Sequence, residues 1–323
     1  MIKAVLLFAV GLVLLIKGGD WFVDGATGIA RRFHLPDIIV GATVVSIGTT
    51  LPEVMVSATG ALGGQGSMAY GNAIGSIICN TSLIAALSVA VNPGPVNTKT
   101  MKMPVIFFFA SAALYCVAAY VLGDFPRWLG IVLLGIFVVY MFLTVRQGLK
   151  NPDAAHEEEE ADAGKPKSLW MELLLLVGGA AIIAVGADLL VDNGTYIAQA
   201  LGVPETVIAL TFVALGTSLP ELVTTITSLK KGHASLGIGN VIGANIFNLV
   251  LVSGISITLA PFEVPVGNTL FGYNSSLVLD MPLMVAVMAI LTIPALTTKK
   301  LHRWQGILLL AIYAAFCVFQ FAM

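Results

Sequence analysis

Two six-residue segments of this chain combine a proline, a carboxylate and hydroxyl groups within apolar sequence. They are GTTLPE at 48–53 and GTSLPE at 216–221. Pro52 has no N–H to offer the carbonyl of residue 48, so we expect the helix to kink or open around Gly48-Thr49. Pro220 is expected to do the same beside Thr217. An opened helix exposes backbone oxygens next to hydroxyls and a glutamate, which is an arrangement suited to binding a cation.

The two glutamates of these segments have no obvious positive partner. Lys17 is the only basic residue inside an apolar segment, and a carboxylate buried in hydrocarbon costs several kcal/mol on insertion scales. Glu53 and Glu221 would repel each other if they met, so they call for a cation or for protons. Oxygen ligands suit Ca²⁺, and Na⁺ with fewer contacts. Because neither histidine nor thiol accompanies the segments, zinc and copper are disfavoured.

A second pair of segments supplies further polar groups. GNAIGSIICN at 71–80 and GNVIGANIFN at 239–248 place asparagines on glycine-rich helices. Ser76 and Asn80 are four residues apart and share one helix face, so both can reach one site. The glycines permit close helix packing. Packing between helices is the alternative role for these asparagines.

Composition indicates a membrane protein. Hydrophobic residues make up 58%, charged residues only 11%, and the mean hydropathy is +0.95, whereas soluble domains carry about 25% charged residues. The net charge of −2 argues against nucleic acid as a partner. Ten apolar segments have the length of a span. They lie at 2–30, 37–63, 68–91, 103–122, 126–147, 168–199, 204–228, 234–260, 277–297 and 302–321.

Lysines and arginines orient these ten spans. Thirteen of the sixteen basic residues fall on one side: Arg31, Arg32, Lys99, Lys102, Arg146, Lys150, Lys165, Lys167, Lys230, Lys231, Lys299, Lys300 and Arg303. Lys3 and Arg127 fall on the other. The positive-inside rule places the thirteen in the cytoplasm and both termini outside a cell membrane. The acidic segment at 148–167, which contains EEEE, is then a cytoplasmic linker.

The two halves of the chain have similar sequences. Shifted by 168 positions, the sequence aligns with itself over three spans of each half, so that Thr49 matches Thr217, Glu53 matches Glu221 and Asn80 matches Asn248. Each half holds five spans, so the second enters the membrane from the opposite side. The predicted fold is an all-α membrane protein with ten transmembrane helices in two inverted five-helix repeats, at 1–147 and 168–323. Secondary transporters use such repeats, with sites near the bilayer midplane.

The paired motifs resemble the alpha-repeats of the cation/calcium exchanger superfamily, and are most similar to its prokaryotic sodium/calcium exchanger branch. G-T-[ST]-L-P-E followed by G-N-x-I-G-[SA], present twice, carries the resemblance along nearly the whole chain. It implies antiport of Na⁺ against Ca²⁺ by alternating access at a shared site. It also implies that the first and sixth helices slide against the remaining bundle.

The resemblance assigns ligands by motif position. Calcium ligands would come from Glu53, Glu221 and the backbone and hydroxyls of Thr49 and Thr217. Sodium positions would draw on Thr50, Ser76, Asn80, Ser218 and Asn248, and on carbonyls near Ser46 and Ala214. Two positions depart from the family pattern. Ala244 stands where the first repeat has Ser76, and Asn248 stands where some relatives carry an aspartate, which puts the number of sodium ions and potassium transport in doubt.

Two alternatives to sodium-driven exchange remain. A proton/calcium antiporter of the same fold would use the two glutamates to exchange Ca²⁺ for H⁺. A passive cation channel would want several weak sites along a pore, whereas these carboxylates stand at one level. An enzyme is disfavoured because no nucleophile and base are paired. We expect no prosthetic group and no obligatory protein partner beyond the lipid bilayer.

Overall fold

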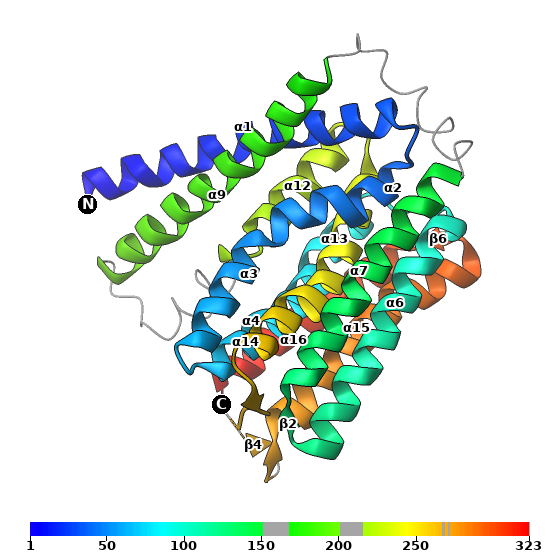
Figure 1. The fold of residues 1–323 in the computed structure, drawn as a ribbon. Coiled ribbons are helices and arrows are strands. Elements are labelled where there is room, and N and C mark those ends of the chain that lie inside the picture. Colours follow the sequence, from blue (N-terminus) through cyan, green and yellow to red (C-terminus); the bar gives the residue numbers. More distant parts are fainter. Residues whose placement is uncertain (151–167, 201–215, 267–268, 271, 323) are drawn as a thin grey trace.

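The structure, a computed structural model, is built almost entirely of helices (Figure 1). It describes residues 1–150, 168–200, 216–266, 269–270 and 272–322. The α-helices are α1 (Ile2–Arg32), α2 (Asp37–Val40), α3 (Ser46–Leu62), α4 (Gly66–Cys79), α5 (Ala86–Val91), α6 (Thr98–Val117), α7 (Arg127–Lys150), α9 (Leu169–Ala200), α12 (Leu219–Lys230), α13 (Ala234–Phe247), α14 (Ser253–Leu259), α15 (Met281–Thr298) and α16 (Arg303–Ala322). Within these ranges, five π-helical turns interrupt or extend the helices: η1 (Gly41–Val45), η2 (Asn80–Ala85), η3 (Ala118–Leu122), η5 (Asn248–Val252) and η6 (Ser276–Asp280).

Three short strand pairs join loops between the helices. β1 (Gly94–Pro95) pairs with β6 (Lys300–Leu301), β2 (Asp124–Phe125) with β3 (Phe262–Glu263), and β4 (Thr269–Leu270) with β5 (Tyr273–Asn274), all antiparallel. Each strand is only two residues long, so the pairs fasten loops and form no core. The sequence did not predict them because two residues are too few for a strand periodicity.

The predicted spans correspond closely to the helices. Within the described residues, nine helical segments are long and apolar enough to cross a membrane. The remaining predicted span, 204–228, lies partly in residues outside the described ranges, and its described part is the beginning of α12. The predicted linker at 148–167 lies outside them except at its start, because α7 continues to Lys150.

Helices α1 and α9 pack side by side and antiparallel across one side of the bundle (Figure 1). Their backbones approach closely at glycines. A Cβ atom added to Gly11 would lie 2.8 Å from the carbonyl oxygen of Gly186, and one added to Gly179 would lie 2.5 Å from the backbone nitrogen of Phe22. Gly11 matches Gly179 at the 168-residue offset, and Gly18 matches Gly186. Small residues that allow such contacts are typical of helix pairs in membranes.

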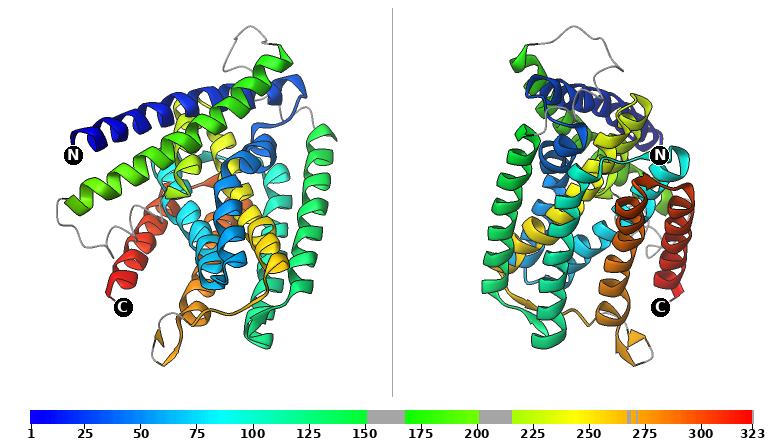
Figure 2. Two further views of the ribbon diagram at one scale, coloured as in Figure 1. Left: turned by 60° about the vertical axis from the view of Figure 1, so that its left-hand side comes forward. Right: turned by 90° about the vertical axis from the view of Figure 1, so that its right-hand side faces the viewer.

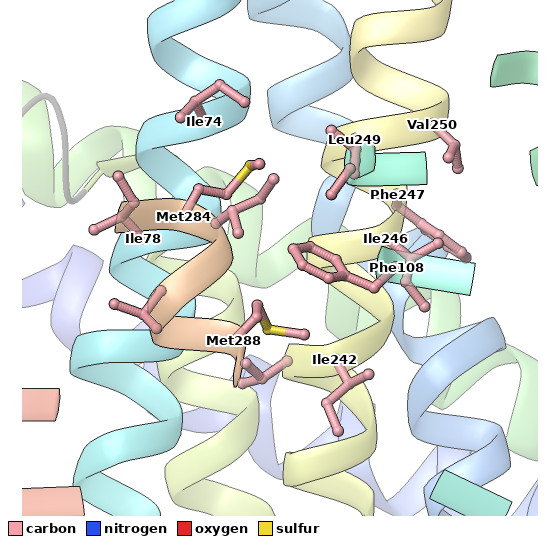
Figure 3. Close-up of a cluster of buried hydrophobic side chains, with 14 of the residues drawn as sticks. Ile74, Ile78, Phe108, Ile242, Ile246, Phe247, Leu249, Val250, Met284 and Met288 are labelled. Carbon is pink, nitrogen blue, oxygen red and sulfur yellow. The ribbon is translucent and has the colours of Figure 1, made fainter. Parts of the chain in front are cut away.

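The other spans pack around a large apolar core. Ile74 and Ile78 of α4, Phe108 of α6, Met284 and Met288 of α15 and a face of α13 interdigitate there (Figure 3). A second, smaller cluster is built mostly from α1 and α9. Two further views show the α1–α9 pair lying obliquely across the remaining helices (Figure 2). The apolar packing therefore divides into a helix pair and a bundle.

Lys231 joins the bundle to the helix pair at one end of the molecule, and a second ion pair at that end holds α1 to α9. Lys231, in the turn after α12, lies 2.6 Å from the Asp24 carboxylate of α1 and donates to the Asp20 carbonyl at 2.9 Å. The Arg32 guanidinium at the end of α1 pairs with Glu172 of α9 at 2.9 Å. This is the end at which the sequence concentrates basic residues.

Candidate cation site

The two proline motifs adopt different backbone conformations. α3 runs without interruption from Ser46 to Leu62 with Pro52 inside it, so the predicted opening around Gly48-Thr49 is wrong for the first repeat. A π-helical turn, η1, precedes α3 directly. In the second repeat Thr217 and Ser218 form a turn. α12 begins directly after this turn, with Pro220 in its first turn, where a missing N–H costs no helical hydrogen bond.

Both asparagines at the matched positions 80 and 248 start a π-helical turn. Asn80 is the first residue of η2 and Asn248 the first of η5. The turns cross over between repeats: η5 contacts α3, which carries Glu53, and η2 contacts α12, which carries Glu221. Each asparagine thus lies on an element that packs against the glutamate helix of the other repeat. π-Helical turns often mark functional sites.

Nearly all the residues predicted to bind cations are buried. Those that are fully or almost fully buried are Ser46, Thr49, Thr50, Glu53, Ser76, Asn80, Ser218, Glu221 and Asn248. Thr217 is half-buried. Ala214 lies outside the described residues, so its predicted carbonyl contribution stays a prediction. Burial of this many polar groups in an apolar protein demands partners for them.

Hydrogen bonds connect the two repeats with two-fold symmetry. The Thr49 hydroxyl donates to the side-chain oxygen of Asn240 at 3.1 Å, and the Thr217 hydroxyl donates to that of Asn72 at 3.4 Å. These bonds are equivalent, because a shift of 168 positions converts Thr49 to Thr217 and Asn72 to Asn240. The asparagines at 72 and 240 therefore position the predicted calcium ligands, which the sequence left open against a role in packing.

The side-chain nitrogen of Asn72 and the backbone carbonyl of Asn240 make further contacts. Asn72 donates to the Glu53 carbonyl at 3.1 Å and to the Ser57 hydroxyl at 2.7 Å. Ser46 donates to the backbone carbonyl of Asn240 at 3.0 Å. The Asn72 bonds hold α3 against α4, and the Ser46 bond holds α3 against α13. The site is consequently fixed by side chains on α3, α4, α12 and α13.

The two glutamates meet at the centre of this arrangement. Both side chains are 0% exposed. Their carboxylates lie close enough to interact as like charges, and the Thr49 side chain lies beside Glu221. In the part of the chain that the structure describes, neither carboxylate has an ion-pair partner or a geometrically good hydrogen bond. Two buried negative charges held together this way are strongly unfavourable unless a cation or protons neutralise them.

Other buried polar atoms near these elements also lack partners. Among the described residues, the amides of Asn80 and Asn248 and the hydroxyls of Thr50 and Ser218 make no hydrogen bond. Carboxylate, amide and hydroxyl oxygens are the ligands that hard cations prefer. The described residues contain no group of three or more His, Cys, Asp or Glu side chains fit for a metal. A cation here would therefore rely on two carboxylates completed by neutral oxygens.

One asparagine of the second motif, Asn245, forms its hydrogen bonds outside the candidate site. Asn245 follows Ala244, the residue that replaces a serine, and its amide donates to the Thr81 hydroxyl at 2.7 Å and to the Met288 sulfur at 3.2 Å. Asn245 thus holds α13 against η2 and α15, and its neighbour Ala244 has no hydroxyl. Neither Ala244 nor Asn245 therefore offers a hydroxyl equivalent to that of Ser76 in the first repeat.

Comparison with protein families decides the affiliation of the chain. Residues 3–146 and 171–322 match the sodium/calcium exchanger protein family. The chain belongs to this family. The sequence comparison thus confirms the resemblance on which the ligand assignments depend, and the family is one of cation transporters whose substrates are Na⁺ and Ca²⁺.

Similar proteins match this chain along nearly its whole length. A sodium/calcium exchanger of Methanosarcina acetivorans, MaX1, is 31% identical, with 98% of both chains covered. An uncharacterized membrane protein of Methanocaldococcus jannaschii, MJ0091, is 37% identical over 95% of this chain and 94% of its own. The structure of the sodium-calcium exchanger NCX_Mj superposes with a TM-score of 0.80 at 33% identity, covering 98% and 97%. The fold of ten helices in two inverted repeats is thereby confirmed.

Proposed function

We propose that the chain is a secondary-active antiporter that exchanges Na⁺ for Ca²⁺ by alternating access at one shared site near the bilayer midplane. The observation that carries this proposal is the pair of buried, unpartnered glutamates, Glu53 and Glu221, one from each inverted repeat. A single Ca²⁺ between them neutralises both charges, and Na⁺ ions can do so in its place. Competition for the same carboxylates couples the two fluxes.

The proposed ligands follow the two motifs. Ca²⁺ takes Glu53 and Glu221 with oxygens of Thr49 and Thr217. Na⁺ takes the neutral oxygens around them, from Ser46, Thr50, Ser76, Asn80, Ala214, Ser218 and Asn248. Since Na⁺ carries a single charge, hydroxyl and amide oxygens are adequate ligands for it. The methyl group of Ala244 removes one such oxygen in the second repeat.

The proposed orientation follows the basic residues. It places the acidic linker, 148–167, in the cytoplasm and both termini outside the cell membrane. The five-helix repeats are residues 1–147 and 168–323. Beyond its ions and the surrounding lipid, the exchanger in this proposal needs no prosthetic group and no protein partner, and its acidic residues bind cations and catalyse no reaction.

The proposed moving part is the α1–α9 pair. Among the described residues, the larger apolar core contains none from α1 or α9, and most of the smaller cluster lies on these two helices. Sliding of the pair changes few contacts inside that core, so the site remains assembled while access changes sides.

Calcium flux in reconstituted vesicles tests the proposal. Vesicles containing the purified chain are given an outward Na⁺ gradient at constant pH, or an outward H⁺ gradient at constant, symmetric Na⁺. We expect saturable uptake of radioactive Ca²⁺ only with the Na⁺ gradient, and release of Na⁺ that depends on external Ca²⁺. Empty vesicles provide the background.

Two other results would replace the proposal. Uptake that ignores Na⁺ and follows pH would assign the chain as a proton/calcium antiporter, for which the close approach of two like carboxylates is the supporting observation. Flux that needs no counter-ion and does not saturate would assign a channel.

Replacement of Asn240 is expected to weaken Ca²⁺ binding without changing the ligands themselves. Asn240→Ala removes the acceptor of the Thr49 hydroxyl, and the loss of one such bond corresponds to an affinity about tenfold lower. Asn245→Ala is the matched control, since Asn245 is also fully buried on α13 but bonds to Thr81. The control should lower thermal stability and leave Ca²⁺ affinity, measured by calorimetry, near that of the native chain. Equal affinities for the two variants would contradict the positioning role of Asn240.

A further inference from the structure

Three hydroxyl groups on α12 are buried without partners. Thr224, Thr225 and Ser228, here called the hydroxyl stripe, are at most 2% exposed. Within the described residues their hydroxyls make no hydrogen bond. Buried threonines elsewhere in the chain bond to the carbonyl four residues earlier, as Thr43 and Thr81 do. The stripe departs from that behaviour, so its hydroxyls are available to other ligands.

The stripe continues from Glu221 along one face of α12. Its members follow Glu221 by three, four and seven residues, which is the spacing of a single helix face. The neighbouring face is different, because Val223 and Thr227 pack on α1 at Gly19. Thr225 faces α13 at Gly237. With a rise of 1.5 Å per residue, the stripe extends about 10 Å from the glutamate.

A cavity of about 330 Å³ lies beyond the far end of the stripe and is lined by residues that follow α12. The carbonyl of Ser228 accepts a hydrogen bond from the backbone of His233 at 2.8 Å. Gly232, Ala234 and Ser235 of the same turn line the cavity, together with the polar side chains of Ser88 and Asn92 from α5 and its end. The cavity lies at the end of the molecule that carries Lys230 and Lys231, the proposed cytoplasmic side. The hydroxyl stripe thus extends from Glu221 toward this cavity, and the backbone of its last member bonds to the turn beside it.

The first repeat contains only one of the three equivalent hydroxyl groups. The positions that match Thr224, Thr225 and Ser228 are Val56, Ser57 and Gly60. Ser57 is satisfied by the Asn72 amide at 2.7 Å, whereas its counterpart Thr225 and the amide nitrogen of the matching Asn240 have no partner among the described residues. Duplication therefore does not account for the stripe, because the first repeat lacks two of its three hydroxyls and its one equivalent, Ser57, has a partner.

From these observations we infer that the hydroxyl stripe is the route between the site and the cytoplasmic cavity, and that it holds a partly hydrated Na⁺ in transit. Neutral hydroxyls provide oxygen ligands without a charge, so they suit a monovalent cation that keeps some of its water and must leave again. A divalent cation would be held mainly at the carboxylates. The inference rests on the proposed function for the identity of the ion.

The first test removes the hydroxyls while keeping the volume. In everted bacterial membrane vesicles, which present the cytoplasmic face, Thr224→Val combined with Ser228→Ala should raise the Na⁺ concentration for half-maximal Ca²⁺ exchange about tenfold, the effect of a lost ligand. Thr227→Val is the matched control on the α1 face and should stay within about twofold of the native value. An unchanged Na⁺ dependence in the double variant would overturn the inference.

A second test requires no measurement of flux. Ser228→Cys should react with a membrane-impermeant methanethiosulfonate added to the cytoplasmic face, and Na⁺ should slow the reaction. The native chain controls for Cys79, Cys116 and Cys317, and Thr227→Cys controls for the face. A folded Ser228→Cys protein that does not react contradicts the route. If the native chain shows no Na⁺-driven flux, the proposed function fails, while the cysteine reaction still decides whether the stripe is hydrated.

Discussion

Replacement of either buried glutamate by glutamine should abolish calcium exchange and leave a folded protein. Glu53→Gln and Glu221→Gln each keep the side-chain shape but remove one of the two carboxylate charges that the described residues bring to the site. Calcium affinity follows the number of charged ligands, and we expect it to fall by about a hundredfold. The repulsion between the carboxylates also disappears, so thermal stability without Ca²⁺ should rise. Isotope exchange and thermal unfolding with and without Ca²⁺ measure both effects.

Glu172→Gln is the matched control for this prediction. Glu172 is also a buried glutamate, but its carboxylate pairs with Arg32 at 2.9 Å. Breaking that pair should lower stability and leave the stabilisation by Ca²⁺ intact. The site assignment fails if both Glu53→Gln and Glu221→Gln still exchange Ca²⁺. The opposite signs of the expected stability changes separate a cation site from a structural ion pair.

A single methyl group between α1 and α9 should have the second large effect. Gly179→Ala places a Cβ atom 2.5 Å from the backbone nitrogen of Phe22 and 2.9 Å from the carbonyl of Gly18. Both contacts are to backbone, so no side chain can turn away and the helices must separate. Overpacking of this kind costs about 1–3 kcal/mol. We expect a lower unfolding temperature and a strongly reduced exchange rate.

The adjacent glycine provides the control. A Cβ atom added to Gly178 meets no other atom within 4 Å. Because alanine favours a helix over glycine by about 0.5–1 kcal/mol, Gly178→Ala should be neutral or stabilising. Fluorescence-detected size-exclusion chromatography after heating compares the two variants. Similar behaviour of Gly178→Ala and Gly179→Ala would show that the close approach of α1 and α9 is not important for stability or exchange.

Some features of the fold could be predicted because they are written along the chain. Length and hydropathy define the spans, since a helix that crosses the bilayer needs about 20 apolar residues. The repetition at an offset of 168 defines the inverted halves, and an odd number of spans per half fixes their inversion. Polar residues stand out against an apolar background, so Glu53, Glu221 and the asparagines are visible as candidates without a structure.

The local response to proline could not be predicted in the same way. Pro52 and Pro220 occupy matched positions, yet α3 continues through Pro52 and α12 begins beside Pro220. Proline removes one hydrogen bond in either case, and the surrounding packing determines where the helix adjusts.

By itself, the sequence determined the ten spans, their inverted repetition and the residues that can bind a cation. The tertiary structure decided how these residues meet: Thr49 bonds to Asn240 of the other repeat, α1 packs against α9 at glycines, and the hydroxyl stripe lies on the face of α12 away from α1. The physical reason is that bundle-facing and lipid-facing surfaces are both apolar, so hydropathy alone does not reveal which helix faces meet.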